Sequence, residues 1–180
     1  KELTEIATRM EGMYGAGVYC PQGKGEGKPC YDLDQLSKTL ATSHDPTQLL
    51  DAWKGWRTIS PPIRPMYRRF VELANEGARG LGYKDTGALW RSKYDMPPDA
   101  FAAEMDRLWA QVKPLYNSLH CYVRAQLQQQ YGKQLVPDHQ PIPAHLLGNM
   151  WAQAWGNLYH DVAPKDDTRG YDLSELLKAK

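Results

Sequence analysis

A chain of 180 residues is long enough for one domain with a packed core, and its length gives no reason to divide it. The formal net charge of +1 argues against a nucleic acid or an anionic membrane surface as the main partner. No apolar run approaches the roughly 20 residues that a helix needs to cross a bilayer. No leader is recognisable at Lys1, so we expect any targeting segment to lie outside this chain.

Three short helices are predicted in the first third of the chain. Residues 1–14 carry apolar side chains at helical spacing. Asp32 is a suitable N-cap for the second helix, and Asp45, followed by Pro46 at the first helical position, begins the third. The apolar positions are Leu3, Ile6, Met10 and Met13 or Tyr14, then Leu33, Leu36 and Leu40, and finally Leu49, Leu50, Trp53 and Trp56.

A longer helix is predicted to begin at Pro61 and Pro62 and to end at Gly80. One side of this helix is apolar and the other is charged. The arginines of the charged side could bind an anion, but acidic residues one turn further on favour a solvated, ion-paired face. Asp85 then caps a short helix that contains Arg91. The charged side consists of Arg64, Arg68, Arg69, Glu72 and Glu76.

The longest predicted helix runs from Pro97 to Gly132 and would span roughly 50 Å at 1.5 Å per residue. Pro114 lies inside it and predicts a kink. Apolar residues in steps of three and four form one face, and further aromatic residues flank it, so we expect more than one neighbouring element to pack there. The face consists of Phe101, Met105, Leu108, Val112, Leu115, Leu119, Val123, Leu127 and Tyr131, flanked by Trp109, Tyr116 and Tyr122.

Two more helices are predicted near the end of the chain. The first covers residues 144–159, and it is apolar over so much of its circumference that we expect burial on several sides. Asp172 is expected to cap the second, whose pattern is interrupted at Lys180, so both ends of the chain are expected to lie within a longer polypeptide. No strand pattern, internal repeat or low-complexity segment is present, and the predicted fold class is an all-α, multi-helix assembly.

Two of the three cysteines bracket a polar, glycine-rich loop. A disulfide between Cys20 and Cys30 would remove about 2–3 kcal/mol of loop entropy from the unfolded state and would indicate an oxidising, extracytoplasmic compartment. Two free thiols in a cytosolic loop are the alternative. Cys121 follows His120, but adjacent helical side chains point about 100° apart, so Cys121 is interpreted as a small buried hydrophobe rather than a nucleophile.

Residues with catalytic chemistry form no recognisable constellation. No two of the five histidines lie three to five positions apart, so no helical pair can share a metal on one face. The glycines within residues 23–27 lack a preceding apolar strand, which argues against a phosphate-binding loop. No Gly-x-Ser-x-Gly elbow is present. Composition and spacing alone therefore do not identify a function.

One motif changes this interpretation. Residues 141–155 read Pro-Ile-Pro-Ala-His-Leu-Leu-Gly-Asn-Met-Trp-Ala-Gln-Ala-Trp and closely resemble a signature stretch of the angiotensin-converting enzyme family, the zinc peptidyl-dipeptidases. The loop between Cys20 and Cys30 also fits the family, and its shortness resembles a bacterial member more than an animal one. The resemblance covers essentially the whole chain. Further matching segments, in the family's order, are residues 41–43, 50–56, 71–83, 90–92, 114–116, 119–120, 122–124 and 131–132.

The resemblance implies a fold and a chemistry. Members of the family are almost entirely helical, and two subdomains enclose a deep central groove. Zinc is held by a His-Glu-x-x-His motif and by a glutamate on a later helix. The glutamate of the motif activates the zinc-bound water, and a dipeptide is released from the C terminus of the peptide substrate. Zinc and chloride are therefore the implied cofactors, and the implied location is secreted or periplasmic.

This chain contains no His-Glu-x-x-His motif. We therefore interpret residues 1–180 as a segment, from the N-terminal half, of a larger helical peptidase domain. Alone it is expected to be inactive, with no catalytic residue and no metal ligand of its own, and the rest of the same polypeptide is an expected partner. Two positions carry over from the resemblance: Arg91 aligns with an arginine that helps to bind the first activating chloride, and Tyr131 with a tyrosine that contacts the second.

A non-catalytic helical binding module on the same scaffold is the alternative hypothesis. A peptidase requires the His-Glu-x-x-His motif further along the parent polypeptide, whereas a binding module would lack it. The structural alternatives for the two chloride positions are a salt bridge at Arg91 and a core role for Tyr131.

Overall fold

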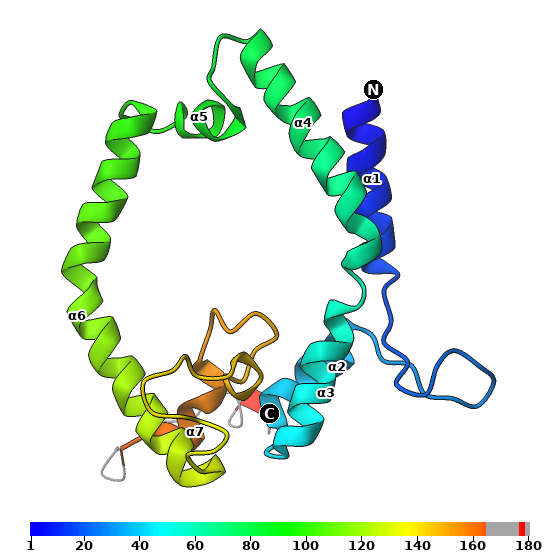
Figure 1. Cartoon of the computed structure of the whole chain (residues 1–180), viewed down its shortest axis with the longest axis vertical. Helices are drawn as coiled ribbons and strands as arrows, with labels where there is room; N and C mark the ends of the chain where they lie inside the picture. Colours follow the sequence, from blue (N-terminus) through cyan, green and yellow to red (C-terminus); the bar gives the residue numbers. More distant parts are fainter. Residues whose placement is uncertain (165–176, 179–180) are drawn as a thin grey trace.

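The computed structural model describes residues 1–164 and 177–178. Over these residues the regular structure is helical, apart from an isolated bridge between Tyr19 and Tyr31, which confirms the predicted all-α class. Figure 1 shows the helices arranged as an open ring. Two helices form one side, one long helix forms the other, and short elements close the base.

One side of the ring consists of α1 (Glu2–Gly15) and α4 (Arg64–Gly80), which pack against each other. The helix predicted to begin at Pro61 and Pro62 starts there as the 3-10 turn η1 (Pro61–Ile63) and continues as α4 from Arg64. Arg69 Nε donates to Glu2 Oε1 at 2.8 Å, and Arg69 Nη1 lies 3.4 Å from Glu72 Oε2. The charged side of α4 is therefore ion-paired at Arg69, as the alternation of basic and acidic residues indicated.

The base of the ring begins with α2 (Leu33–Thr42) and α3 (Pro46–Arg57). Asp32 accepts from the Gln35 backbone at 2.9 Å, and the Gln35 side chain returns a bond to Asp32 N at 3.0 Å, which completes a capping box. Asp45 accepts from Thr47 N at 2.9 Å. Both predicted caps are thereby confirmed. The hydrophobic core lies here and is formed by Leu36, Leu40, Leu49, Ala52, Trp56, Val123, Leu127, Val136, Ile142, Leu146, Leu147, Met150 and Leu158.

The top and the far side of the ring are formed by α5 (Thr86–Arg91) and α6 (Pro98–Tyr131). Asp85 caps α5 by accepting from Ala88 N at 2.7 Å. The long helix α6 is continuous through Pro114 and curves in Figure 1. At its lower end, Arg124 donates to the carbonyl of Pro137 at 2.9 Å and ties the following loop to the helix.

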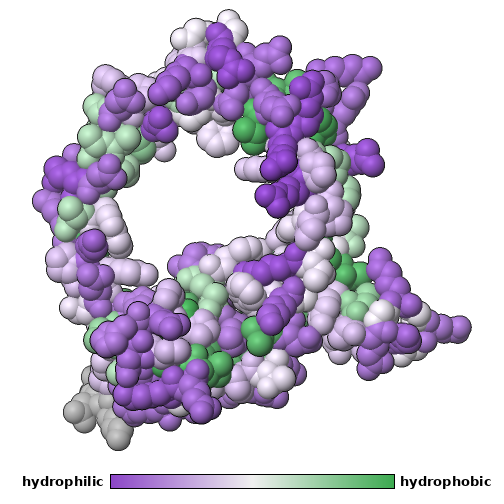
Figure 2. All heavy atoms as spheres, in the orientation of Figure 1, coloured by the Kyte–Doolittle hydropathy of each residue, from purple (hydrophilic) through white to green (hydrophobic). Residues whose placement is uncertain are grey.

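Burial along α6 differs from the sequence expectation. Only Val123 and Leu127 of its described apolar face are fully buried. Figure 2 shows that side chains do not fill the opening that α6 borders, so the middle of this helix is uncovered on that side, although α5 contacts its upper end. The large apolar residues exposed on α6 are Met105, Leu108, Trp109, Val112, Leu115, Tyr116, Leu119 and Tyr122.

The prediction of a helix over residues 144–159 is wrong. The structure has the 3-10 turns η2 (Ala144–Leu146) and η3 (Gly156–Leu158), followed by the short helix α7 (Tyr159–Val162). Gly148 and Ala152 adopt positive φ of 68° and 56°, which no α-helix permits. Asn157 Nδ2 donates to Gly148 O at 2.8 Å and holds the loop closed. Burial on several sides is still achieved, because Leu146 and Met150 are almost completely enclosed.

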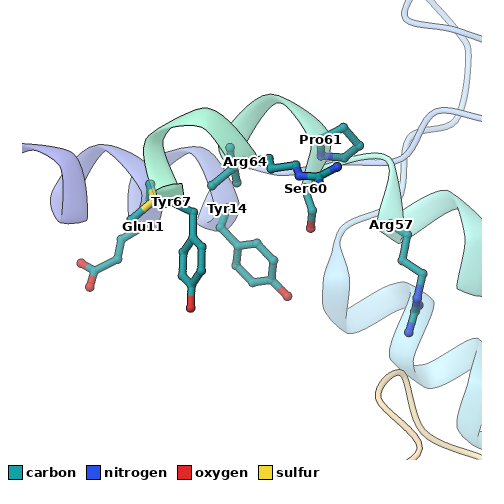
Figure 3. Close-up of a pocket in the computed structure, with 9 residues that line it drawn as sticks. Glu11, Tyr14, Arg57, Ser60, Pro61, Arg64 and Tyr67 are labelled. Atoms are coloured by element: carbon teal, nitrogen blue, oxygen red, sulfur yellow. The ribbon is translucent and has the colours of Figure 1, made fainter. Parts of the chain in front are cut away.

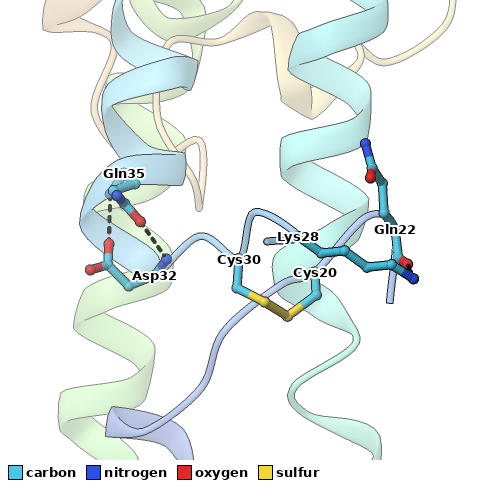
Figure 4. Close-up of a disulfide and its surroundings, with 6 residues drawn as sticks. All are labelled: Cys20, Gln22, Lys28, Cys30, Asp32 and Gln35. Atoms are coloured by element: carbon cyan, nitrogen blue, oxygen red, sulfur yellow. Dashed lines mark hydrogen bonds between the residues drawn. A yellow bond between two sulfur atoms is a disulfide. The ribbon is translucent and has the colours of Figure 1, made fainter. Parts of the chain in front are cut away.

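The cysteines give one confirmation and one correction. Cys20 and Cys30 form a disulfide, with a Cα–Cα distance of 4.2 Å, at the neck of an exposed loop (Figure 4). Cys121 is exposed, so its interpretation as a buried hydrophobe is wrong; on this part of α6 the core takes Val123 instead. The predicted cap at Asp172 lies outside the described residues. Within residues 1–164 and 177–178, no helix combines the length and apolar character needed to cross a membrane.

Candidate functional site

Arg91 is the last residue of α5, at the top of the ring. Its guanidinium folds back over the first turn, and a Cβ added to Gly87 would lie 3.2 Å from Arg91 Nη1, so glycine gives the side chain room. Arg91 Nε is buried and has no hydrogen-bond partner among the described residues. Because buried donors in folded proteins are almost always paired, this atom requires a partner.

Tyr131 is the last residue of α6, at the base of the ring. It lines a small cavity of about 110 Å³ together with His145, Asn157 and Asp161. Burial raises the pKa of the Tyr131 hydroxyl, and the nearby Asp161 carboxylate raises this pKa further. The hydroxyl accepts a hydrogen bond from Gln130 at 3.3 Å. Tyr131 is therefore a half-buried phenol in a small cavity with both polar and apolar walls, and it stays protonated at neutral pH.

The two predicted chloride positions lie at opposite ends of α6. A helix of 34 residues spans roughly 50 Å. Arg91 precedes this helix and Tyr131 ends it, so the structure does not bring them into one site.

The histidines near Tyr131 behave differently from one another. His44 Nε2 lies 3.1 Å from Asp161 Oδ1 and links the α2–α3 connection to α7. His145 is only 6% exposed, and its Nε2 has no hydrogen-bond partner among the described residues. Burial lowers the pKa of His145, and the charge of Lys54 lowers it further, so this imidazole is neutral at physiological pH. Among the residues that the structure describes, no group of three His, Cys, Asp or Glu side chains could hold a metal ion.

The signature stretch is anchored to α3 by Arg57. Arg57 Nη2 donates to Met150 O at 2.7 Å, and Nη1 donates to Trp53 O at 2.8 Å. The guanidinium also lies 3.5 Å from the centroid of the Trp53 ring, a cation–π contact. Burial lowers the pKa of Arg57, although an arginine stays charged at neutral pH. The loop that carries Trp151 is therefore held by side-chain bonds rather than by a helical backbone.

A groove of about 810 Å³ was not anticipated from the sequence. It runs between α1, α4 and the end of α3, and Tyr14 and Tyr67 project into it side by side (Figure 3). Tyr67 is 59% exposed, whereas Tyr14 is half-buried and accepts a hydrogen bond from Trp56 Nε1 at 3.0 Å. The sequence predicted only that Tyr14 lies on the apolar face of a helix. The groove could not be predicted, because only the packing of α1 on α4 brings Tyr67 beside Tyr14.

Comparison with known proteins supports the family resemblance that residues 141–155 indicated. The sequence profile of the angiotensin-converting enzyme family matches residues 1–180. The chain is 40% identical over 182 residues to angiotensin-converting enzyme of Bos taurus, which covers 100% of this chain and 14% of that protein. It is 41% identical over 179 residues to the angiotensin-converting enzyme-like protein Ace3 of Mus musculus, with 98% of this chain and 24% of that protein covered.

A third relative gives a similar result. Angiotensin-converting enzyme of Theromyzon tessulatum is 38% identical over 179 residues, covering 98% of this chain and 29% of that protein. The chain thus spans between one seventh and less than a third of the length of these relatives. Because the family profile covers every residue, the chain belongs to the angiotensin-converting enzyme family of peptidases.

Proposed function

We propose that this chain is part of a zinc peptidyl-dipeptidase, an enzyme that releases dipeptides from the C termini of peptides. The observation that carries the proposal is the match of the family profile to all of residues 1–180. In this proposal the chain is one segment of a larger helical domain, and the rest of the same polypeptide is its principal partner.

The exposed apolar face of α6 supports the proposal of a larger domain. Leu115 is 73% exposed and Val112 is 52% exposed, and they belong to one run of apolar side chains along the helix. Soluble proteins rarely leave a contiguous apolar surface of this kind uncovered. Relatives that match the chain are several times longer, so they contain enough further polypeptide to cover this face.

The described residues do not fit a zinc site. A zinc site needs three His, Asp, Glu or Cys ligands close together, and the described part of the chain contains no such group. We therefore propose that the zinc ligands and the catalytic glutamate belong to the rest of the polypeptide, and that residues 1–180 are inactive alone. No step of peptide hydrolysis is assigned to a residue of this segment.

Chloride binding at Arg91 and Tyr131 is a further part of the proposal. The buried, unpartnered Nε of Arg91 is a suitable donor to an anion. Tyr131 adjoins the Asp161 carboxylate, whose negative charge opposes an anion, so a site there requires a cation from the rest of the polypeptide. For the isolated chain we expect no shift in melting temperature when acetate replaces chloride at fixed ionic strength. A shift would contradict the dependence on distant residues.

An extracytoplasmic location, secreted or periplasmic, is proposed on the Cys20–Cys30 disulfide. Disulfides persist in oxidising compartments and are rare in the cytosol. Expression with and without an export signal, followed by thiol labelling of the purified protein, would measure whether the bond forms in the native compartment. Complete labelling of Cys20 and Cys30 in protein from its natural source would refute the location.

The decisive experiment compares the parent polypeptide with residues 1–180. The parent is expected to bind zinc in a one-to-one ratio and to release dipeptides from a synthetic peptide in a chelator-sensitive manner, whereas the 180-residue chain does neither. A parent that binds no zinc and releases no dipeptide would contradict the peptidase. In that case a non-catalytic binding module on the same scaffold would be the better description.

A further inference from the structure

The groove between α1 and α4 has a chemical polarity along its length. In Figure 3, Glu11 lies at one end, Tyr67 and Tyr14 follow, and Ser60 and Arg57 lie at the other end. The two tyrosine rings project in the same direction from their two helices, but the Tyr14 hydroxyl is bonded to Trp56 Nε1, so Tyr67 is the ring that is free to contact a ligand. The groove therefore has an acidic end, an aromatic middle and a basic end.

Arg64 adds an uncommitted cation to the basic end. Its guanidinium extends toward Pro61, away from Glu11 (Figure 3). Within the described part of the chain it makes no ion pair, in contrast to Arg69 on the same helix, which pairs with Glu2. Glu11 likewise has no cationic partner among these residues. A free cation and a free anion at opposite ends of one groove complement a ligand that carries both charges.

The size and lining of the groove favour a short ligand with an aromatic or large apolar side chain. Its volume of about 810 Å³ lies within the range of sites that enclose small ligands, about 300–1,000 Å³. Met10 and Ile63 add apolar surface beside the tyrosines. Tyrosine rings contribute large contact area and stack favourably against another ring.

We propose that this groove binds a short zwitterionic peptide, with its carboxylate toward Arg64, its amino group toward Glu11, and an aromatic side chain against the exposed ring of Tyr67. This site is separate from the zinc chemistry proposed above, and it requires no residue outside this chain. Binding is therefore expected even in a chain that has no peptidase activity.

The test is a titration of the 180-residue chain with the tripeptide Ala-Phe-Ala in the presence of a metal chelator, followed by backbone amide chemical shifts. We expect saturable shifts confined to residues of α1, α4, η1 and the end of α3. Acetylation of the amino group or amidation of the carboxylate removes one exposed charge pair and should weaken binding about two- to fivefold. Equal affinities of the free and the doubly blocked tripeptide would overturn the proposal.

Matched variants locate the site. Arg64→Gln should weaken Ala-Phe-Ala about two- to fivefold and lose its sensitivity to amidation, whereas Arg68→Gln, an exposed arginine of α4 outside the groove, should leave the affinity unchanged. Glu11→Gln should remove the sensitivity to acetylation. Tyr67→Ala should weaken binding about fivefold through the lost ring contact. No saturable shift, or an effect of Arg68→Gln as large as that of Arg64→Gln, overturns the site.

The presence of the chelator separates this test from the test of the peptidase. Binding of Ala-Phe-Ala that persists in chelator supports the groove whether or not the parent polypeptide is a zinc enzyme. If the titration shows no saturable binding, the proposed peptide site in the groove is refuted and the peptidase proposal is unaffected.

Discussion

The substitution Leu127→Ala tests whether the core at the base of the ring stabilises this chain. Leu127 is 0% exposed and packs in the core with Val136 and Leu146. Leucine-to-alanine changes at such sites cost about 2.7–5 kcal/mol, because transfer free energy is lost and a cavity is left. Val136 and Leu146 would line the void that Leu127→Ala leaves, so we expect a cost within that range.

Leu115 provides the matched control. It belongs to the same predicted apolar face of α6, but it is 73% exposed in this structure. Leu115→Ala should therefore change the free energy of unfolding of the 180-residue chain by less than about 0.5 kcal/mol. In a longer polypeptide that covers α6, the same change should cost about 2–5 kcal/mol.

The assay is urea denaturation of both variants, followed by far-UV circular dichroism, with unchanged m-values as the check that the same surface unfolds. If Leu127→Ala and Leu115→Ala cost the same in the isolated chain, the division of α6 into a buried and an exposed part is wrong. If Leu115→Ala stays neutral in the longer polypeptide, the proposed coverage of α6 by the rest of the chain is wrong.

Three further predictions concern the disulfide, the pH dependence and a helix cap. Replacing Cys20 and Cys30 by serine should cost about 2.7 kcal/mol in urea, from a loop of 10 residues, whereas Cys121→Ser, at an exposed free thiol, should cost under about 0.5 kcal/mol. Because burial lowers the pKa of His145, the contribution of its neutral form to stability is complete above pH about 6.5 and is lost as pH falls below that value. His145→Gln should therefore flatten the dependence of the free energy of unfolding on pH. Asp32→Ala removes the capping box of α2 and should cost about 1 kcal/mol in the same urea assay, and no measurable loss would mean that this cap does not stabilise the helix.

The elements that follow from neighbouring residues were predictable. Asp32, Asp45 and Asp85 each accept a backbone N–H within three residues, so the helix starts depend on contacts that the sequence itself places close together. The disulfide also closes a short loop, so the entropic cost of bringing its two cysteines together is small. The family could be identified for the same reason, since its signature stretch is a run of adjacent residues.

What depends on distant residues was not predictable. The periodicity of residues 144–159 suits a helix, but Arg57 and Asn157 bond the carbonyls of Met150 and Gly148, and Gly148 and Ala152 adopt positive φ. The groove exists only because α1 packs on α4, which sets Tyr14 beside Tyr67.

The sequence by itself determined that the chain is all-α, where α2, α3 and α5 begin and to which family the chain belongs, because each rests on residues that are close in the chain or on a local motif. Only the tertiary structure decided which half of α6 is buried, since Leu115 and Leu127 have the same residue type and belong to the same pattern. Their burial differs because α2, α3 and the loops after α6 converge on one end of that helix, whereas Leu115 lies in the middle part of α6 that borders the opening of the ring.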